Sequence, residues 1–271
     1  MSDPYRFSTV LPSRLPYPWE GNQHRAGIMD LSGILAMAIM FVLVCIFGTI
    51  GGLLFYLGMF KEILVNVGKP PIRKARIFYK FARGDYKESG ALFEELNKLA
   101  PGLRSLGVYY DDPEKTSPMG RRYIIGSILE ENGVPGLEDR ERLKEIEDAL
   151  KAGGFKETEL PEAENAVSAD FPWRTGFSVY IAVNRVYGVL NNFVKEKRLD
   201  VGPYVELYDA KAEKIHFFAP LDKQDQFYVL ECLEAANEDD EDFDDLSPES
   251  GNDEEAADDA ETKAESAQEE Q

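Results

Sequence analysis

Histidine and cysteine, the usual residues of acid–base and nucleophilic chemistry near neutral pH, number two each in this 271-residue chain, and none forms a recognised catalytic arrangement. The histidines are His24 and His216, and the chain has no C-x-x-C pair, phosphate-binding glycine loop or G-x-S-x-G turn. A single histidine in an alternating segment is more often packed or half exposed than catalytic. We therefore expect no catalytic residue, no metal site and no cofactor, and a protein that is not an enzyme.

One carboxylate could still take part in ligand binding. Glu206 lies in a segment with strand character, where the side-chain period of two places it on one face with Tyr204 and Tyr208. These three side chains could line a pocket. The alternative, a solvent-exposed strand carboxylate, is the more common situation for an isolated glutamate and is favoured.

A second arrangement suits protein recognition rather than catalysis. Phe243 and Leu246 interrupt a strongly acidic tail. An aromatic and an aliphatic side chain three residues apart in an extended segment can fill two neighbouring pockets while the backbone adds a strand to a partner's sheet. Flanking carboxylates suit a basic rim on that partner and speed the encounter; they are Asp240, Glu241, Asp242, Asp244 and Asp245.

The bare aromatic-x-x-aliphatic pattern recurs along the chain, and two further matches compete with Phe243 and Leu246. Phe93 and Leu96 are expected inside a helix, with Leu96 on the stripe that faces the core. Phe60 and Ile63 stand at the end of a long apolar stretch. The acidic tail, which we expect to be disordered, is the more suitable setting for strand addition, and this favours Phe243.

That apolar stretch, residues 31–60, contains no charged residue. As a helix, residues 34–57 would measure roughly 36 Å at ~1.5 Å per residue, enough to cross a ~30 Å hydrocarbon core. A signal peptide has a shorter apolar region nearer the start of the chain. A soluble core helix that is apolar on every side would need a far larger protein around it. We predict a transmembrane signal-anchor helix in contact with the lipid bilayer.

Small residues within the predicted span allow two interpretations. Gly48 and Gly52 form a G-x-x-x-G pair, which lets two membrane helices approach closely and form a homodimer. Glycine is also common in membrane helices generally, and this simpler explanation is favoured.

The flanks of the span predict its orientation. The twenty residues before it hold two strong bases, Arg14 and Arg25, and the twenty after it hold six. The more positive flank stays in the cytosol. Residues 1–30 are then a short luminal stub, and the rest of the chain is cytosolic. The absence of any N-x-Ser/Thr acceptor agrees with this orientation.

Charge separates a folded region from a tail. The formal net charge is -20, and residues 237–271 contain seventeen acidic residues against one lysine. The large apolar side chains of residues 233–271 are limited to Leu233, Phe243 and Leu246, so these residues are expected to be disordered. The folded region shows no basic stripe interleaved with aromatic residues, and we expect no direct nucleic-acid binding.

Between a basic juxtamembrane connector, residues 61–75, and the tail, residues 76–232 are expected to form one α+β domain. A strand, a helix and two strands are predicted over 77–129 and again over 167–218, with a further helix over 137–151. Tyr110-Asp111 and Tyr208-Asp209 end equivalent strands. Two β-α-β-β halves pack as one antiparallel sheet system with helices on one side and a ligand groove between the halves.

With these segments in place, the chain resembles the testis-expressed, membrane-anchored family that carries a gyrase-inhibitor-like (GyrI-like) domain and acts as a receptor for selective autophagy of the endoplasmic reticulum. The matching segments cover most of residues 70–230; they include Pro70-Pro71-Ile72-Arg73, Val108-Tyr109-Tyr110-Asp111, Gly126-Ser127-Ile128-Leu129, Lys195-Glu196-Lys197-Arg198-Leu199, Ile215-His216-Phe217 and Phe227-Tyr228-Val229. The resemblance implies the doubled β-α-β-β fold. It also implies that Glu206 binds a cationic ligand or assists hydrolysis, as a glutamate does in related soluble domains.

For the whole chain, the resemblance implies a single-pass receptor of the endoplasmic-reticulum membrane that reaches the autophagosome and lysosome during turnover. Its partners would be ubiquitin-like autophagy modifiers held by Phe243 and Leu246. Protein quality-control or DNA-repair factors are implied by the family alone. The alternative that stays open is a membrane-anchored domain that binds or hydrolyses a small molecule in the groove near Glu206.

Overall fold

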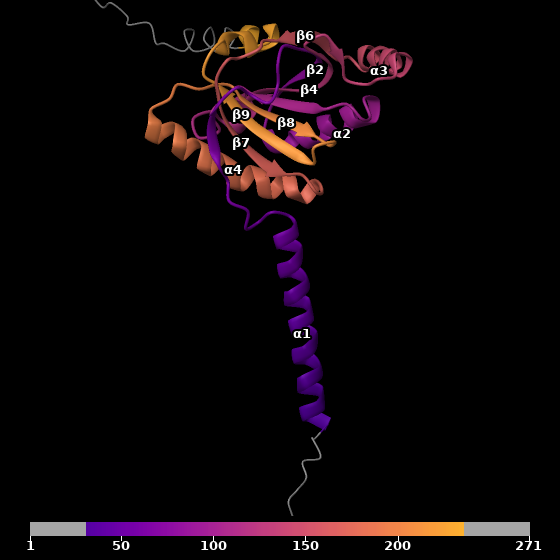
Figure 1. The fold of residues 1–271 in the computed structure, drawn as a ribbon, viewed down its shortest axis with the longest axis vertical. Coiled ribbons are helices and arrows are strands. Elements are labelled where there is room, and N and C mark those ends of the chain that lie inside the picture. The colour runs from indigo at the N-terminus through magenta and orange to yellow at the C-terminus, as the bar shows by residue number, and fades with distance from the viewer. Residues whose placement is uncertain (1–30, 236–271) are drawn as a thin grey trace, which may run out of the picture. The chain divides into compact units, whose positions relative to one another are not determined.

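The computed structural model describes residues 31–235, and the chain divides into two compact units between Leu54 and Phe55. The first unit contains helix α1 (Leu31–Tyr56) as far as Leu54, and the last two residues of the helix belong to the second unit. Helix α1 contains no charged residue and has no buried side chain (Figure 1). Of the helices within 31–235, α1 is the one long and apolar enough to cross a membrane. The predicted span, residues 31–60, is thus helical as far as Tyr56, and residues 57–60 form a turn. Residues 1–30 and 236–271 lie outside the described residues, whereas residues 233–235, expected to belong to a disordered tail, are helical, and Ala235 is buried.

The second unit, called the folded unit below, is built on one antiparallel sheet. Its strands are β1 (Val65–Gly68), β2 (Ala75–Arg83), β3 (Ser105–Tyr109), β4 (Arg122–Glu131), β5 (Val134–Pro135), β6 (Lys156–Leu160), β7 (Ala166–Pro172), β8 (Tyr204–Asp209) and β9 (Lys214–Pro220). The strand order is β1-β7-β9-β8-β3-β4-β2-β6, and β5 pairs with β4. The helices are α2 (Ser89–Leu99), α3 (Arg140–Ala152) and α4 (Gly176–Lys197).

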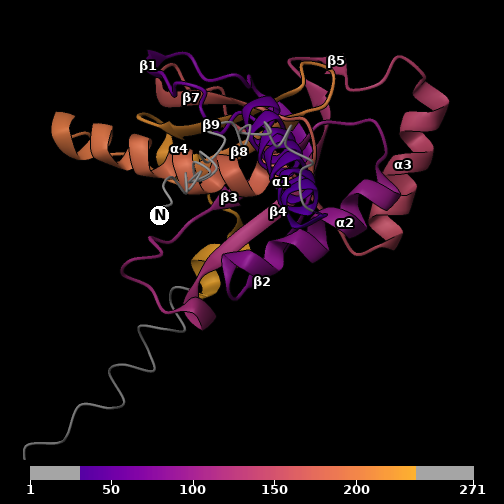
Figure 2. The same ribbon diagram turned by 90° about the horizontal axis from the view of Figure 1, so that it is seen from below.

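The sheet confirms the predicted doubling. One half is β2-α2-β3-β4 and the other is β7-α4-β8-β9, and the halves meet where β3 pairs with β8. Gly107 of β3 lies opposite Glu206 of β8 at the centre of this pair. The strand order on either side, β8-β9-β7 and β3-β4-β2, is the same in both halves, as a pseudo-two-fold axis requires. The fold is α+β, with α2 and α4 side by side on one face of the sheet (Figure 2).

Three clusters of buried side chains fill the two faces of the sheet. One packs under α4 and includes Phe171 and Phe217; another packs under α2 and α3 and includes Phe78 and Ile125. The third lies on the opposite face and is covered by the C-terminal segment, which contributes Phe227, Val229 and Cys232. Each half thus has its own helix-covered core, and the space between α2 and α4 falls over the β3–β8 pair.

The folded unit begins earlier in the chain than the sequence suggests. Residues 61–75, expected to be a connector outside the domain, supply β1, which pairs with β7 at the edge of the sheet. Leu57 and Ile72 are fully buried. Lys69, Lys74 and Arg76 form ion pairs with acidic residues of the same unit, so part of the basic cluster is neutralised there.

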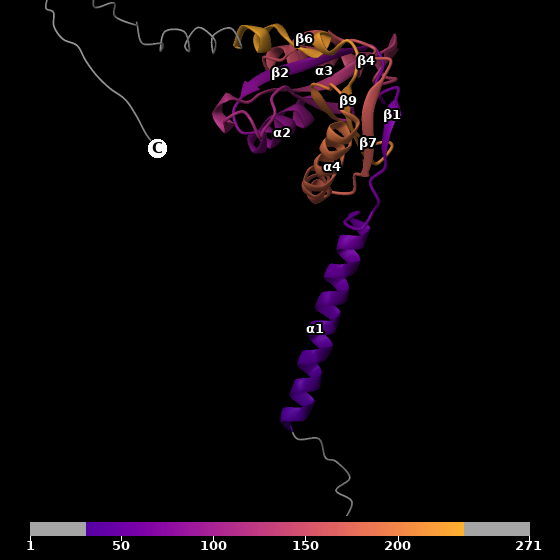
Figure 3. The same cartoon turned by 90° about the vertical axis from the view of Figure 1, so that its left-hand side faces the viewer.

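The chain joins and leaves the folded unit at opposite ends of the strands. A side chain at Gly58 would meet Pro172, the last residue of β7, so the chain joins the unit there. The C-terminal segment is held at the other end of the sheet, where the Arg122 guanidinium at the start of β4 donates to the Cys232 carbonyl over 3.0 Å. In Figure 3 the C-terminal segment, drawn in yellow, lies beside β2 and β6, and β1 and β7 lie side by side at the edge of the sheet.

Candidate functional site

The most unusual side chain of the folded unit is a buried carboxylate in the middle of the sheet. Glu206 is 3% exposed, on the face of β8 that carries α2 and α4. Because side chains alternate along a strand, Glu206 shares this face with Tyr204 and Tyr208, as the sequence predicts. The favoured expectation of a solvent-exposed carboxylate is wrong.

Three tyrosine hydroxyls donate hydrogen bonds to this carboxylate. Tyr208 donates to Oε2 over 2.6 Å and Tyr109 donates to the same oxygen over 3.3 Å. Tyr187, from α4, donates to Oε1 over 2.8 Å. The donors come from β8, β3 and α4, so the site is assembled from both halves of the fold.

Glycine at position 107 makes room for one of these donors. A Cβ atom there would lie only 3.0 Å from the Tyr109 ring, which lies over residue 107 on the same face of β3. Gly107 is also the direct partner of Glu206 across the strand pair. The missing side chain therefore opens the path by which the Tyr109 hydroxyl reaches the neighbouring strand.

Aromatic rings enclose the polar centre. The Tyr208 ring makes edge contacts with Phe93 of α2 and with Trp173, at centroid distances of 5.0 and 5.4 Å. The Tyr187 ring contacts Tyr204 and Phe217 at 5.5 and 5.6 Å. The space between α2 and α4, where a ligand groove was expected, is filled at this point by rings.

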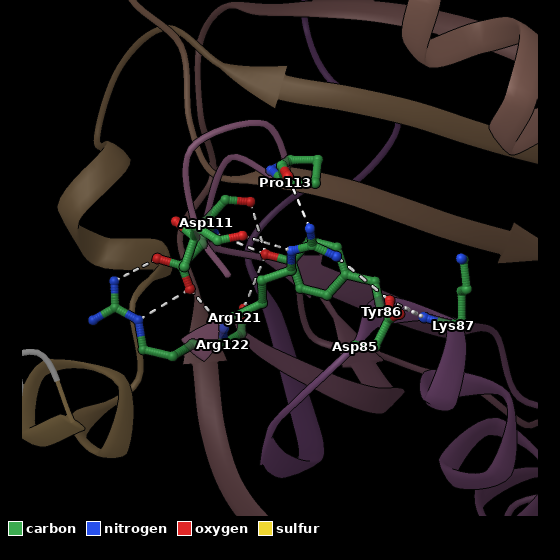
Figure 4. Close-up of polar contacts among 8 residues, drawn as sticks. Asp85, Tyr86, Lys87, Asp111, Pro113, Arg121 and Arg122 are labelled. Atoms are coloured by element: carbon green, nitrogen blue, oxygen red, sulfur yellow. Dashed lines mark hydrogen bonds and ion pairs between the residues drawn. The ribbon is translucent and has the colours of Figure 1, made fainter. Parts of the chain in front are cut away.

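A polar network fixes the wall of the site on the β3–β4 side (Figure 4). The Asp111 carboxylate accepts two bonds from the Arg122 guanidinium, over 2.6 and 3.1 Å. The Tyr86 hydroxyl donates to the Asp111 carbonyl and accepts from the Asp111 amide. The Tyr86 ring then contacts the Tyr109 ring at 4.9 Å. The network thus connects the loop after β3 to a donor of Glu206.

Arg121 shapes the rest of that loop. Its guanidinium donates to the Thr116 and Pro113 carbonyls over 3.1 and 2.8 Å, and it also pairs with Asp85 over 3.4 Å (Figure 4). Arg121 therefore connects two parts of the loop between β3 and β4, and it also joins this loop to Asp85, just before the short helical turn that leads into α2.

Burial dominates the electrostatics of the centre. Desolvation raises the pKa of Glu206 above the ordinary glutamate value, against the three tyrosine hydrogen bonds, which favour the charged form. Desolvation and the neighbouring carboxylate also raise the pKa values of Tyr109, Tyr187 and Tyr208, so the phenols keep their protons at neutral pH. A cationic ligand would have to displace one of these donors to reach the carboxylate.

The remaining predicted residues are distributed across the structure. Tyr204 donates to the Asn191 side chain over 2.6 Å rather than to Glu206. The His216 Nδ1 atom lies 2.7 Å from Asp170 Oδ1, in a half-buried pair. Gly48 and Gly52 lie on α1 with open space around them. All seven tail residues proposed to bind a modifier, Asp240, Glu241, Asp242, Phe243, Asp244, Asp245 and Leu246, lie outside the described residues.

Two competing aromatic-x-x-aliphatic segments do lie in the described part of the chain. Phe93 and Leu96 are in α2, as predicted, and Leu96 is 1% exposed. Ile63 packs against the cluster under α4, although Phe60 is exposed. Neither segment presents both side chains for strand addition.

Sequence reasoning missed Tyr109 and Tyr187 as parts of the site. Tyr109 has a local signal, since it stands two residues after Gly107 and must therefore share its face of the strand. Tyr187 gives a weaker signal. Its position one turn after Val183 places it beside the apolar stripe of α4, but nothing in the sequence connects that stripe to Glu206.

Comparison with known proteins supports the resemblance. The chain is 35% identical over 207 residues to testis-expressed protein 264 of Homo sapiens, a match that covers 76% of this chain and 61% of the human protein. It is 37% identical over 179 residues to the Mus musculus homologue, covering 66% of this chain and 55% of the mouse protein. The chain thus spans about three fifths of the relatives that it matches. No family model matches it.

Solved structures give a more distant likeness. The EcmrR C-terminal domain is 12% identical with a TM-score of 0.35, and the match covers 59% of this chain and 96% of that domain. A hydrolase from Listeria innocua is 9% identical with a TM-score of 0.31, covering 59% of this chain and 91% of the hydrolase. Scores of this size support no conclusion about function.

Proposed function

We propose, on the premise that this chain is a relative of the testis-expressed protein 264 proteins, that it is a single-pass receptor for selective autophagy of the endoplasmic reticulum. In this proposal α1 anchors the chain, and the folded unit and the tail face the cytosol. Phe243 and Leu246 bind ubiquitin-like autophagy modifiers by strand addition. The chain would act by tethering one membrane to another, without chemical catalysis.

The observation that carries this proposal is the combination of a helix long and apolar enough to cross a membrane with similarity to these relatives over 76% of the chain. The structure adds support by elimination. Of the three aromatic-x-x-aliphatic segments considered, the two in the described part of the chain have one or both side chains packed into the folded unit. Phe243 and Leu246 are then the remaining candidates for modifier binding.

Binding of the detergent-solubilised full chain to immobilised, purified modifiers tests the proposal. Replacing Phe243 and Leu246 together by alanine should weaken binding at least thirtyfold, since loss of an anchor residue in a pocket typically costs ~2 kcal/mol or more. The matched control replaces Ser247 and Pro248 by alanine in the same segment and should leave binding unchanged. Equal binding by the wild-type chain and the Phe243/Leu246 variant would exclude these two residues as the modifier-binding motif.

The second candidate is a membrane-anchored GyrI-like domain that binds or hydrolyses a small molecule near Glu206. The observation in its favour is a buried carboxylate at the junction of the two halves. This candidate predicts that a library of organic cations contains compounds that raise the melting temperature of the wild-type chain but not of a Glu206→Gln variant. The receptor proposal requires no such compound.

A further inference from the structure

Two exposed aromatic side chains stand out on the surface of the folded unit. Phe177 and Tyr180, one turn apart in the first turns of α4, are 57% and 66% exposed. Their ring centroids lie 6.0 Å apart, so the two rings form one apolar patch. Phe60 is a third exposed aromatic residue of this unit, at 68%. We call Phe60, Phe177 and Tyr180 the aromatic face.

The aromatic face lies close to the residue at which α1 ends. Leu57 directly follows α1 and is buried among the side chains under α4. The next carbonyl, that of Gly58, accepts a hydrogen bond from Arg185 of α4 over 2.8 Å. The Arg174 guanidinium, two residues before α4, lies 5.7 Å from the centre of the Tyr56 ring. The chain therefore contacts α4 within two residues of the end of α1.

This short connection limits the length of chain between the end of α1 and the aromatic face. Consecutive Cα atoms are ~3.8 Å apart, so Phe60 lies at most ~15 Å of chain beyond Tyr56. Arg174 before α4 and Arg185 in its third turn contact Tyr56 and Gly58, so the first turns of α4 lie between two contacts with these residues. If α1 spans a membrane, all three aromatic side chains lie within reach of the headgroup region.

The residue types suit that environment. Tyrosine is enriched at the boundary between hydrocarbon and water, and phenylalanine is common on the apolar face of segments that lie in the headgroup region. The basic residues next to the face are Lys61, Arg174 and Arg185, and the acidic ones are Glu62 and Glu213, which pairs with Arg174. This nearly balanced charge suits a mixed headgroup layer and does not require strongly anionic lipid.

We infer that the aromatic face docks on the headgroup layer of the membrane that α1 anchors, so that the folded unit rests on lipid rather than standing free in solution. This inference depends on the proposed membrane anchor. A second copy of the chain is the competing occupant of the same face.

The test places single cysteine labels in the full chain, reconstituted at one chain per nanodisc. Each chain carries one environment-sensitive fluorophore, and the lipid is phosphatidylcholine with or without a fifth of phosphatidylserine. In a chain with Cys45→Ala and Cys232→Ala, the label is placed by Phe177→Cys or by Tyr180→Cys. The matched control is Met119→Cys, an exposed position in the loop between β3 and β4, at the other end of the strands.

If the inference holds, the labels at positions 177 and 180 shift to shorter emission wavelengths and are quenched by lipids that carry a nitroxide near the headgroup. The label at position 119 shows neither change. If labels at 177 and 180 behave like the label at 119, the inference is overturned. It is also overturned if they are shielded only in nanodiscs that contain two chains, with no quenching by lipid, because a second copy then covers the face.

A separate label distinguishes failure of the anchor from failure of the face. Cys45 lies in the middle of α1, so a chain with Cys232→Ala can be labelled there. Quenching of this label by a nitroxide deep in the acyl chains establishes the span independently. If this label is not quenched, both the membrane anchor and the docking of the aromatic face are rejected. If it is quenched, the labels at positions 177 and 180 test only whether the aromatic face docks on the headgroup layer.

Discussion

At the scale of single residues, the folded unit depends on a carboxylate that is stabilised by phenols instead of by a cation. Glu206 is buried with three tyrosine donors, and burial of a charge without such donors costs several kcal/mol. The shortest of the three bonds is that from Tyr208. Loss of one of these hydroxyl groups should therefore lower the free energy of unfolding of the folded unit.

Replacing Tyr208 by phenylalanine should lower the free energy of unfolding by about 1–3 kcal/mol, because the change removes a buried hydrogen bond to the carboxylate while keeping the ring. Denaturant unfolding of the detergent-solubilised chain measures this. The matched control is Tyr180→Phe, in which the lost hydroxyl belongs to an exposed ring and stability should stay the same. Equal stability of the two variants would mean that Tyr208 does not stabilise the carboxylate.

The raised pKa of Glu206 predicts a pH dependence with a definite sign. A carboxyl whose pKa is higher in the folded state than in the unfolded state favours folding most at low pH, where it is protonated in both states. As the pH rises from the ordinary glutamate value through the raised one, the carboxyl ionises readily in the unfolded chain, whereas burial opposes its ionisation in the folded chain, so stability falls.

Glu206→Gln removes this titration. The stability of the wild-type chain minus that of the variant should therefore decrease as the pH rises from mildly acidic to neutral, and stay constant below the ordinary glutamate range. Denaturant midpoints measured across this range provide the comparison. A difference that increases with pH would contradict a raised pKa.

At the scale of elements, the loop between β3 and β4 is held by ion pairs rather than by apolar packing. The Asp111–Arg122 pair is largely buried, with side-chain exposures of 9% and 17%. Arg122 also anchors the C-terminal segment through the Cys232 carbonyl, so one guanidinium joins two elements that are far apart in the sequence.

Asp111→Asn should therefore destabilise the folded unit by up to ~3 kcal/mol, since it leaves a mostly buried guanidinium without its opposite charge. The neighbouring Asp112→Asn is the matched control. Asp112 is more exposed and pairs with Lys115 at the surface, where an ion pair contributes at most ~1 kcal/mol. The two thermal unfolding curves show the difference, and similar melting temperatures would indicate that the buried pair contributes little.

The elements of the two β-α-β-β halves are predictable from the sequence, because their apolar side chains recur with helical or strand periods. The edge strands β1 and β6 are not. β1 has four residues, and β6 reads Lys-Glu-Thr-Glu-Leu, a polar sequence of the kind that protects a sheet edge from further pairing. The burial of Glu206 is also beyond local reasoning. Two of its three donors, Tyr109 and Tyr187, come from elements that only the tertiary fold brings together.

At the scale of the whole molecule, the proposed orientation predicts which part of the chain a protease can reach. In sealed vesicles with the cytosolic side outward, an added protease should remove the tail, while residues 1–30 stay protected until detergent opens the vesicles. Epitope tags at the two ends, followed by immunoblotting, measure this. Protection of the C-terminal tag instead would invert the topology and exclude cytosolic modifiers as partners.

The opposite positions of Pro172 and Arg122 have a further consequence for the proposed tether. The strand β7, seven residues long, measures roughly 23 Å at ~3.3 Å per residue, and this length separates the point where the chain arrives from the point where it departs. From Ala235 to Phe243 the chain adds eight residues, a maximal stretch of roughly 26–29 Å. The path from Pro172 to Phe243 thus has a fixed part along the sheet and a tail part of similar length, so deleting residues between Ala235 and Phe243 would shorten only the second part.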